Sequence, residues 1–227
     1  MRNKIFVILF LAVLAVAMVP TAQAGLVTCR TGNGCLNGND SYDWTKNYGA
    51  PFSNIPNNSV ATSNGGVKVT VNFAGGGAGQ RRDQGNGWGG NFTNGDELLW
   101  TNSPGQGPLN FMNFGTTLTG IGANIQADFF GAFTAQLCDS NGMCVQENGN
   151  SDPNGDGSAI FIGLTDANGF TSATFSVLTC ALDCNDFAIN QLDIVTGGTG
   201  VPEPGTILML GSGLLGAVAY GRRRLGL

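Results

Sequence analysis

The middle of the chain alternates hydrophobic and polar residues in short runs. Residues 67–73 (VKVTVNF) place β-branched side chains on one face, and residues 121–127 (IGANIQA) also alternate. A period of two is typical of a strand with one buried face, and no stretch shows a convincing helical period of 3.6. The pattern therefore predicts many short β-strands separated by turns rich in Gly and Asn. The predicted strands are 67–73, 98–100, 121–127, 133–137, 144–146, 159–164, 173–178 and 187–195.

One pair of these strands carries a hairpin signal. Residues 139–142 (DSNG) lie between 133–137 and 144–146, and the Asn-Gly step adopts positive φ at low cost. Several short antiparallel strands at close spacing predict an all-β fold, a β-sandwich or jelly roll, over residues 25–200. The expected core is rich in phenylalanine: Phe73, Phe111, Phe129, Phe133, Phe161, Phe175 and Phe187.

Two segments of this region are expected to be irregular. Residues 25–66 are rich in Asn, Ser and Gly and include Trp44. Residues 74–95 form a Gly-rich stretch that is long for a loop in a compact domain, and we interpret it as a flexible insert or a functional rim. Trp88 lies inside that stretch.

The first 24 residues have the composition of an export signal. Arg2 and Lys4 precede an apolar run over residues 5–19, which ends in the small residues of an Ala22-Gln23-Ala24 site. This order predicts a secretory signal peptide, exported by the Sec route and cut by signal peptidase after Ala24. The alternative is an uncleaved anchor, but the apolar run is short for a membrane span.

Charge and composition narrow the function classes. Residues 25–200 contain fourteen acids and five bases, a balance of −9, so we expect no nucleic-acid partner. The chain contains no histidine. This excludes Ser-His-Asp and Cys-His catalysis and histidine metal sites, and it favours a non-catalytic protein.

All six cysteines lie in the predicted exported region, where an even number indicates disulfides. Six cysteines allow fifteen connectivities, but these six fall into three close pairs. A cysteine-only zinc site is the competing interpretation, and the spacings are not those of zinc ribbons. The first-choice pairs are Cys29–Cys35, Cys138–Cys144 and Cys180–Cys184.

Residues 152–157 (DPNGDG) resemble the opening of an EF-hand loop. The closing acid should stand at position twelve, which is Gly163, so the segment is not an EF-hand. A structural calcium ion held by Asp152, Asn154 and Asp156 is one hypothesis, and a polar turn between two strands is the other. The Asp96-Glu97 pair beside strand 98–100 is a second calcium candidate.

The composition changes again after Gly200. Residues 201–204 (VPEP) precede an apolar stretch over residues 205–220, which ends at a basic cluster. The stretch predicts a single, short transmembrane helix in the inner membrane, with the basic cluster in the cytoplasm. The residues of this pattern are Pro202, Glu203, Pro204, Arg222, Arg223 and Arg224.

This tail, residues 201–227, closely resembles the PEP-CTERM sorting signal of Gram-negative bacteria. The resemblance implies processing by exosortase and delivery to the cell surface or extracellular matrix, in association with exopolysaccharide and biofilm. Residues 121–131, 159–163 and 186–192 resemble the β-sandwich ectodomains often found ahead of this tail, which supports the fold but implies no activity.

The sequence therefore predicts three parts: a signal peptide (1–24), a β-sandwich ectodomain (25–200) and a sorting segment (201–227). The first functional hypothesis is a structural or adhesive surface protein. The second is a carbohydrate-binding module, assisted by calcium, with sugars stacked on Trp44, Trp88 or Trp100. The third is a secreted hydrolase, which needs two positioned carboxylates that no motif singles out.

The tail can be tested directly. Replacing Pro202, Glu203 and Pro204 together by Ala should leave an unprocessed precursor in the inner membrane, because the processing enzyme loses its recognition sequence while the apolar stretch remains. Immunoblots of membrane and extracellular fractions report the outcome. Normal processing of this variant would refute the sorting signal.

Overall fold

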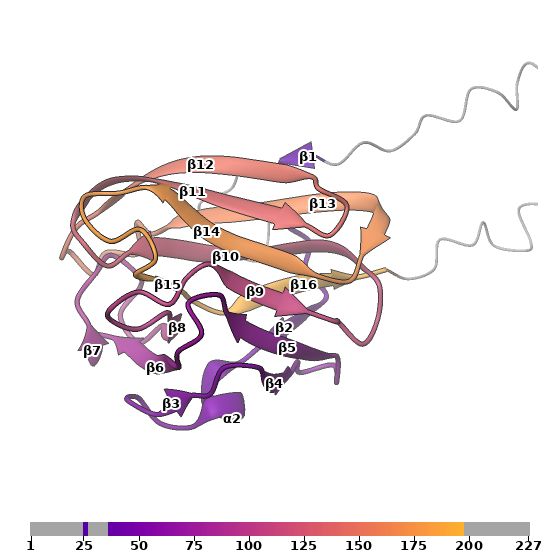
Figure 1. Cartoon of the computed structure of the whole chain (residues 1–227), viewed down its shortest axis with the longest axis horizontal. Coiled ribbons are helices and arrows are strands. Elements are labelled where there is room, and N and C mark those ends of the chain that lie inside the picture. Colours follow the sequence, from indigo (N-terminus) through magenta and orange to yellow (C-terminus); the bar gives the residue numbers. More distant parts are fainter. Residues whose placement is uncertain (1–24, 27–35, 198–227) are drawn as a thin grey trace, which may run out of the picture. The chain divides into compact units, whose positions relative to one another are not determined.

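The predicted strands form two sheets in the computed structural model, which describes residues 25–26 and 36–197. Neighbouring strands are antiparallel except for β6 and β7, which pair in parallel. The first sheet has the order β1-β13-β10-β15-β8-β6-β3, with β16 beside β10 and β2, and with β7 beside β6. The second sheet has the order β12-β11-β14-β9-β5-β4. Figure 1 shows the strands of each sheet succeeding one another from β12 and β13 down to β3 and β4.

The strands of the first sheet are β1 (Gly25–Leu26), β2 (Asp40–Tyr42), β3 (Asn54–Ile55), β6 (Gly79–Gln84), β7 (Gly87–Trp88), β8 (Glu97–Trp100), β10 (Leu118–Ala127), β13 (Ile160–Phe170), β15 (Phe187–Ile189) and β16 (Leu192–Thr196). Those of the second are β4 (Ser59–Thr62), β5 (Lys68–Phe73), β9 (Leu109–Met112), β11 (Gly131–Asp139), β12 (Cys144–Ser151) and β14 (Ala173–Thr179). One short helix, α2 (Trp44–Tyr48), follows β2.

A single hydrophobic core joins the two sheets. Val71 and Phe111 of the second sheet lie in the same buried cluster as Ile125 and Ile189 of the first. In β5 the inward residues are buried while Lys68, Thr70 and Asn72 alternate with them on the outer face. Burial of one face of each sheet against the other is the arrangement of a β-sandwich, which confirms the predicted all-β class.

Several details differ from the prediction. Phe129 is only partly buried, whereas the other six predicted core phenylalanines are buried. The run predicted as one strand over 187–195 is two strands, β15 and β16, interrupted at Asn190 and Gln191. The stretch 74–95 is not an irregular loop throughout, because it contains strand β6 between β3 and β8.

The first sheet is buried on both faces around β8. Leu98 and Leu99 point to opposite faces of the strand, yet neither is exposed. Leu99 belongs to the main core, while Leu98 packs with Trp88 and Phe92 in a second cluster. Residues 85–95, which we term the cover loop, therefore close the outer face of this sheet.

Gln126 of β10 anchors the cover loop. Its Oε1 accepts hydrogen bonds from Trp88 Nε1 at 3.1 Å and from the Asn91 amide at 2.9 Å. Gly90 lies so close to Gln126 that a Cβ there would stand 2.1 Å from this oxygen. Glycine is thus required where the loop approaches the sheet, which explains part of the Gly-rich composition.

Two of the predicted disulfides are present. Cys138–Cys144 closes the β11–β12 hairpin at the turn of residues 139–142, and Cys180–Cys184 closes the loop after β14. Cys29 and Cys35 lie outside the described residues. So do the cleavage-site residues Ala22 and Ala24 and the sorting tail.

Removing the hairpin disulfide should lower stability modestly. Replacing Cys138 and Cys144 by Ser releases a loop with a sequence separation of 6. Loop-closure entropy for so short a loop corresponds to about 2 kcal/mol in the free energy of unfolding, or roughly 4–8 °C in the thermal midpoint. Calorimetry of the secreted protein checks this. An unchanged midpoint would show that the bond contributes no stability.

Candidate functional site

Three segments far apart in the sequence enclose a pocket of about 320 Å³. They are the β2–α2 junction, the turn before β8 and the break between β15 and β16. The volume is at the small end of the range for ligand sites. The lining residues are Tyr42, Asp43, Trp44, Gly95, Asp96, Glu97, Asn190 and Gln191.

Two of the three pocket acids also hold the structure together. Asp43 caps helix α2, accepting a hydrogen bond from the Lys46 amide at 2.7 Å, and this bond lowers the pKa of Asp43. Glu97 Oε2 accepts from the Thr45 amide at 3.0 Å. These contacts fix the positions of both carboxylates relative to the helix.

Asp96 is the pocket acid with the fewest partners. Burial raises its pKa, and a long hydrogen bond from Asn190 Nδ2, at 3.4 Å, opposes that shift. Asn190 is itself fixed, since its Oδ1 accepts from the Asn124 amide at 2.9 Å and its carbonyl accepts from Trp44 Nε1 at 2.7 Å. The pocket thus presents a half-buried carboxylate beside a rigid amide, an arrangement that accepts hydrogen bonds from ligand hydroxyl or amine groups.

Arg81 fixes the β6 side of this region. Its side chain is 1 % exposed, and its terminal nitrogens contact Asp83 at 2.5 Å, Thr45 Oγ1 at 2.5 Å and Glu97 at 3.7 Å. A buried guanidinium needs such partners, because leaving its charge unpaired away from water is costly. Arg81 therefore ties β6 to both α2 and β8.

The tryptophans do not form an exposed platform. Trp44 is fully buried, Trp88 is 5 % exposed and Trp100 is partly buried. The hypothesis of sugars stacked on tryptophan in one groove therefore finds no support in Trp44 or Trp88. Trp44 instead stacks between Tyr42 and Phe111 in the core.

The calcium candidates behave as turn residues. Asp152 Oδ1 accepts from the Asn154 amide and Asp156 Oδ1 from the Ser158 amide, each at 3.0 Å. Hydrogen bonds of this kind are typical of Asx turns. Across residues 25–26 and 36–197, no three Cys, Asp or Glu side chains gather closely enough to form a metal site. Calcium binding at this loop stays a prediction.

Sequence reasoning found only part of the pocket. It singled out Asp96 and Glu97 as adjacent acids at a strand start, and the structure places both in the pocket wall. It missed Asp43 and Asn190 in the pocket wall, and it did not reveal that Arg81, which contacts Glu97, is buried. The Asp preceding a helical turn was an available signal for Asp43, but nothing local marks Asn190.

Comparisons with known proteins concern the tail alone. A family model described as the PEP-CTERM protein-sorting motif matches residues 200–224. No curated protein and no solved structure matches the chain. The tail thus carries a PEP-CTERM sorting motif, and the chain is an exported protein that exosortase sorts and that is membrane-anchored before release. Among the described residues, no helix is long and apolar enough to cross a membrane.

The buried Asp186 predicts a pH-dependent stability. Burial raises its pKa to about 6, while its Oδ1 accepts from Trp100 Nε1 at 2.6 Å. An unfolded aspartate loses its proton near pH 4, so the unfolded state binds fewer protons between about pH 4 and 6. Stability should therefore fall as the pH rises through this window, by up to about 3 kcal/mol.

Asp186→Asn should remove most of this loss, because the amide oxygen still accepts from Trp100 and no charge is buried. Chemical denaturation at pH 4.5 and pH 7 measures the difference. If the variant keeps the full pH dependence of the native protein, Asp186 is not its source.

Proposed function

We propose that this protein has a non-catalytic, adhesive role at the cell surface or in the extracellular matrix, after cleavage of residues 1–24 and processing of the tail. The sorting motif supports the destination. The observation that carries the adhesive role is the rigid, acid-lined pocket, whose walls are fixed by Asn190, Trp44 and Glu97.

The pocket also supports a carbohydrate-binding function as the second candidate. Its volume of about 320 Å³ lies at the small end of the range for ligand sites, and Asp96 offers a carboxylate to hydroxyl groups. Carbohydrate hydroxyls suit such a wall because each can donate to a carboxylate and accept from an amide. On this proposal the exopolysaccharide of the producing cell is the partner, and calcium is not needed.

A non-catalytic role fits the work that the pocket acids do. Asp43 caps a helix and Glu97 contacts both Thr45 and the buried Arg81. A glycosidase needs two carboxylates free to act on the scissile bond. Within the described residues the Asp96 carboxylate is bonded only to Asn190 and the Thr93 amide, so it is the one pocket acid that neither caps the helix nor contacts Arg81.

Asp96→Asn should weaken retention of the protein in the matrix about threefold or more, since it replaces the least engaged acceptor of the pocket by an amide of the same shape. The full chain is expressed in the producing bacterium without its own copy, and the matrix-bound fraction is measured by immunoblot.

Glu147→Gln is the matched control, because it removes one negative charge from the edge strand β12, where Glu147 makes no side-chain hydrogen bond to the described residues, and it should leave retention unchanged. Equal retention of both variants and the native protein would rule out the pocket as the adhesive site. Release of reducing sugars by the native protein, but not by Asp96→Asn, would instead indicate a hydrolase.

A further inference from the structure

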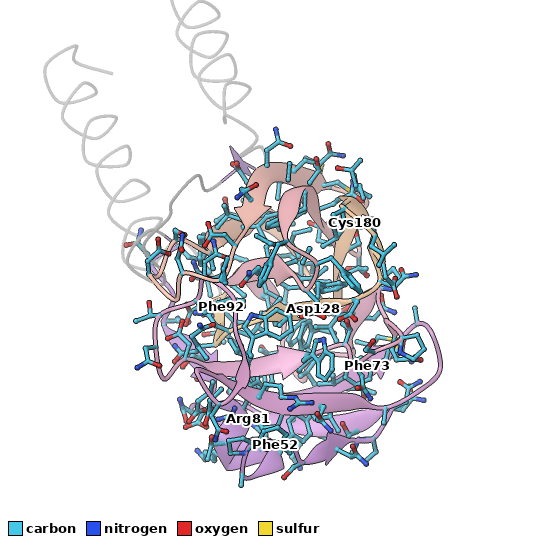
Figure 2. The ribbon with its side chains drawn as sticks, turned by 90° about the vertical axis from the view of Figure 1, so that its left-hand side faces the viewer. Phe52, Phe73, Arg81, Phe92, Asp128 and Cys180 are labelled. Atoms are coloured by element: carbon cyan, nitrogen blue, oxygen red, sulfur yellow. A yellow bond between two sulfur atoms is a disulfide. The ribbon has the colours of Figure 1, made fainter. Side chains whose placement is uncertain are left out.

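A second constellation lies on the other face of strand β6. Successive residues of a strand point to opposite faces, so Arg82 points away from the side that Arg81 serves. Its guanidinium carbon lies 4.4 Å from the ring centroid of Phe52 and 4.7 Å from that of Trp100. Figure 2 shows Phe52 beside Arg81 at the lower end of the molecule, with Asp128 nearer the middle.

The Arg82 guanidinium is held in place but its donors are unused. Gly87 packs so closely that a Cβ there would lie 2.7 Å from Arg82 Nη1. Among the described residues Arg82 makes no side-chain hydrogen bond and no ion pair, whereas the neighbouring Arg81 contacts Asp83, Thr45 and Glu97. Nε of Arg82 is buried, so the terminal nitrogens Nη1 and Nη2 are the donors that stacking preorganises for a ligand.

Phe52 has two energetically unfavourable features, a strained backbone and an exposed apolar side chain. Its φ is +72°, in the left-handed region that a bulky side chain rarely adopts, and its side chain is 52 % exposed. The conformation is fixed by a hydrogen bond from the Phe52 amide to the Arg81 carbonyl at 2.7 Å. Strained residues of this kind are concentrated at binding sites, where the surrounding structure holds them.

Asp128 supplies an acceptor near these donors. It lies at the end of β10, where its amide bonds the Asp186 carbonyl at 3.0 Å, and its carboxylate has no hydrogen-bond partner among residues 36–197. It is close enough to Arg82 for the two charges to interact, but no direct ion pair joins them. Arg82 and Asp128 therefore lie near each other, and neither side chain forms an ion pair among the described residues.

We propose that Phe52, Arg82 and Asp128 form a binding site for a neutral sugar unit of a polysaccharide. The apolar C–H face of a pyranose ring packs on the exposed ring of Phe52. Its hydroxyls accept from Arg82 and donate to Asp128. The inference rests on the proposed adhesive function but assigns a different site, which would make the ectodomain able to hold two polysaccharide segments.

The charge balance of the site favours a neutral ligand over an anionic one. Arg82, the cation of this site, is balanced by Asp128, and the buried Asp186 accepts a hydrogen bond from Trp100, on which Arg82 stacks. A carboxylate or sulfate on the ligand would meet these acids on a domain that already carries net negative charge.

The test is affinity electrophoresis of the full chain in detergent, through gels that contain the neutral or the acidic fraction of the producing cell's exopolysaccharide. Retardation is expected in the neutral fraction only. Phe52→Gly should weaken it roughly tenfold, the loss of one ring contact. Because glycine accepts the positive φ, this variant should keep a near-native thermal midpoint.

Val60→Ala is the control, since it truncates another exposed apolar side chain, 58 % exposed, on the second sheet and should bind normally.

Asp96→Asn distinguishes the Phe52 site from the pocket site. Loss of retardation in Phe52→Gly but not in Asp96→Asn supports the proposal. It is overturned if Phe52→Gly binds as the native chain does, if only Asp96→Asn loses binding, or if the native chain is retarded in the acidic fraction or in neither.

Discussion

The buried charge of Arg81 organises the functional half of this domain. Its side chain joins β6 to helix α2 and strand β8 through Thr45, Asp83 and Glu97. Its main chain pairs with the loop before β3, which sets the conformation of Phe52. Both candidate sites thus depend on one residue. A buried guanidinium is tolerated only with its partners in place, so Arg81 and its acidic partners each depend on the other.

Local signals in the sequence accounted for the framework. Strands such as β5 and β11 alternate with a period of two because only one face of each is buried, and this is visible residue by residue. The β11–β12 hairpin followed from an Asn-Gly turn flanked by Cys138 and Cys144, which the register places opposite each other. Close cysteine spacing sufficed because a short loop leaves few other partners.

Long-range packing accounts for what the sequence did not reveal. Leu98 and Leu99 are both buried because the cover loop closes the outer face of the sheet. The pattern of hydrophobic and polar residues in the strand does not predict that a loop covers it. Asp96 meets Asn190 across 94 residues. Arg81 and Arg82 are identical in type and adjacent in sequence, yet Arg81 is buried with acidic partners and Arg82 is stacked on Phe52 and Trp100. Only the strand's two faces distinguish them.

The last strand has a mechanical consequence for a protein sorted by its C-terminal tail. Strand β16 is paired on both edges, with β10 on one side and β2 on the other. Tension on the chain beyond Thr196 enters the domain along this strand. Because both edges of the strand are paired, detaching it requires breaking its hydrogen bonds to β10 and to β2. The tether point is therefore built into a strongly supported part of the sheet, where a pull is shared among many bonds.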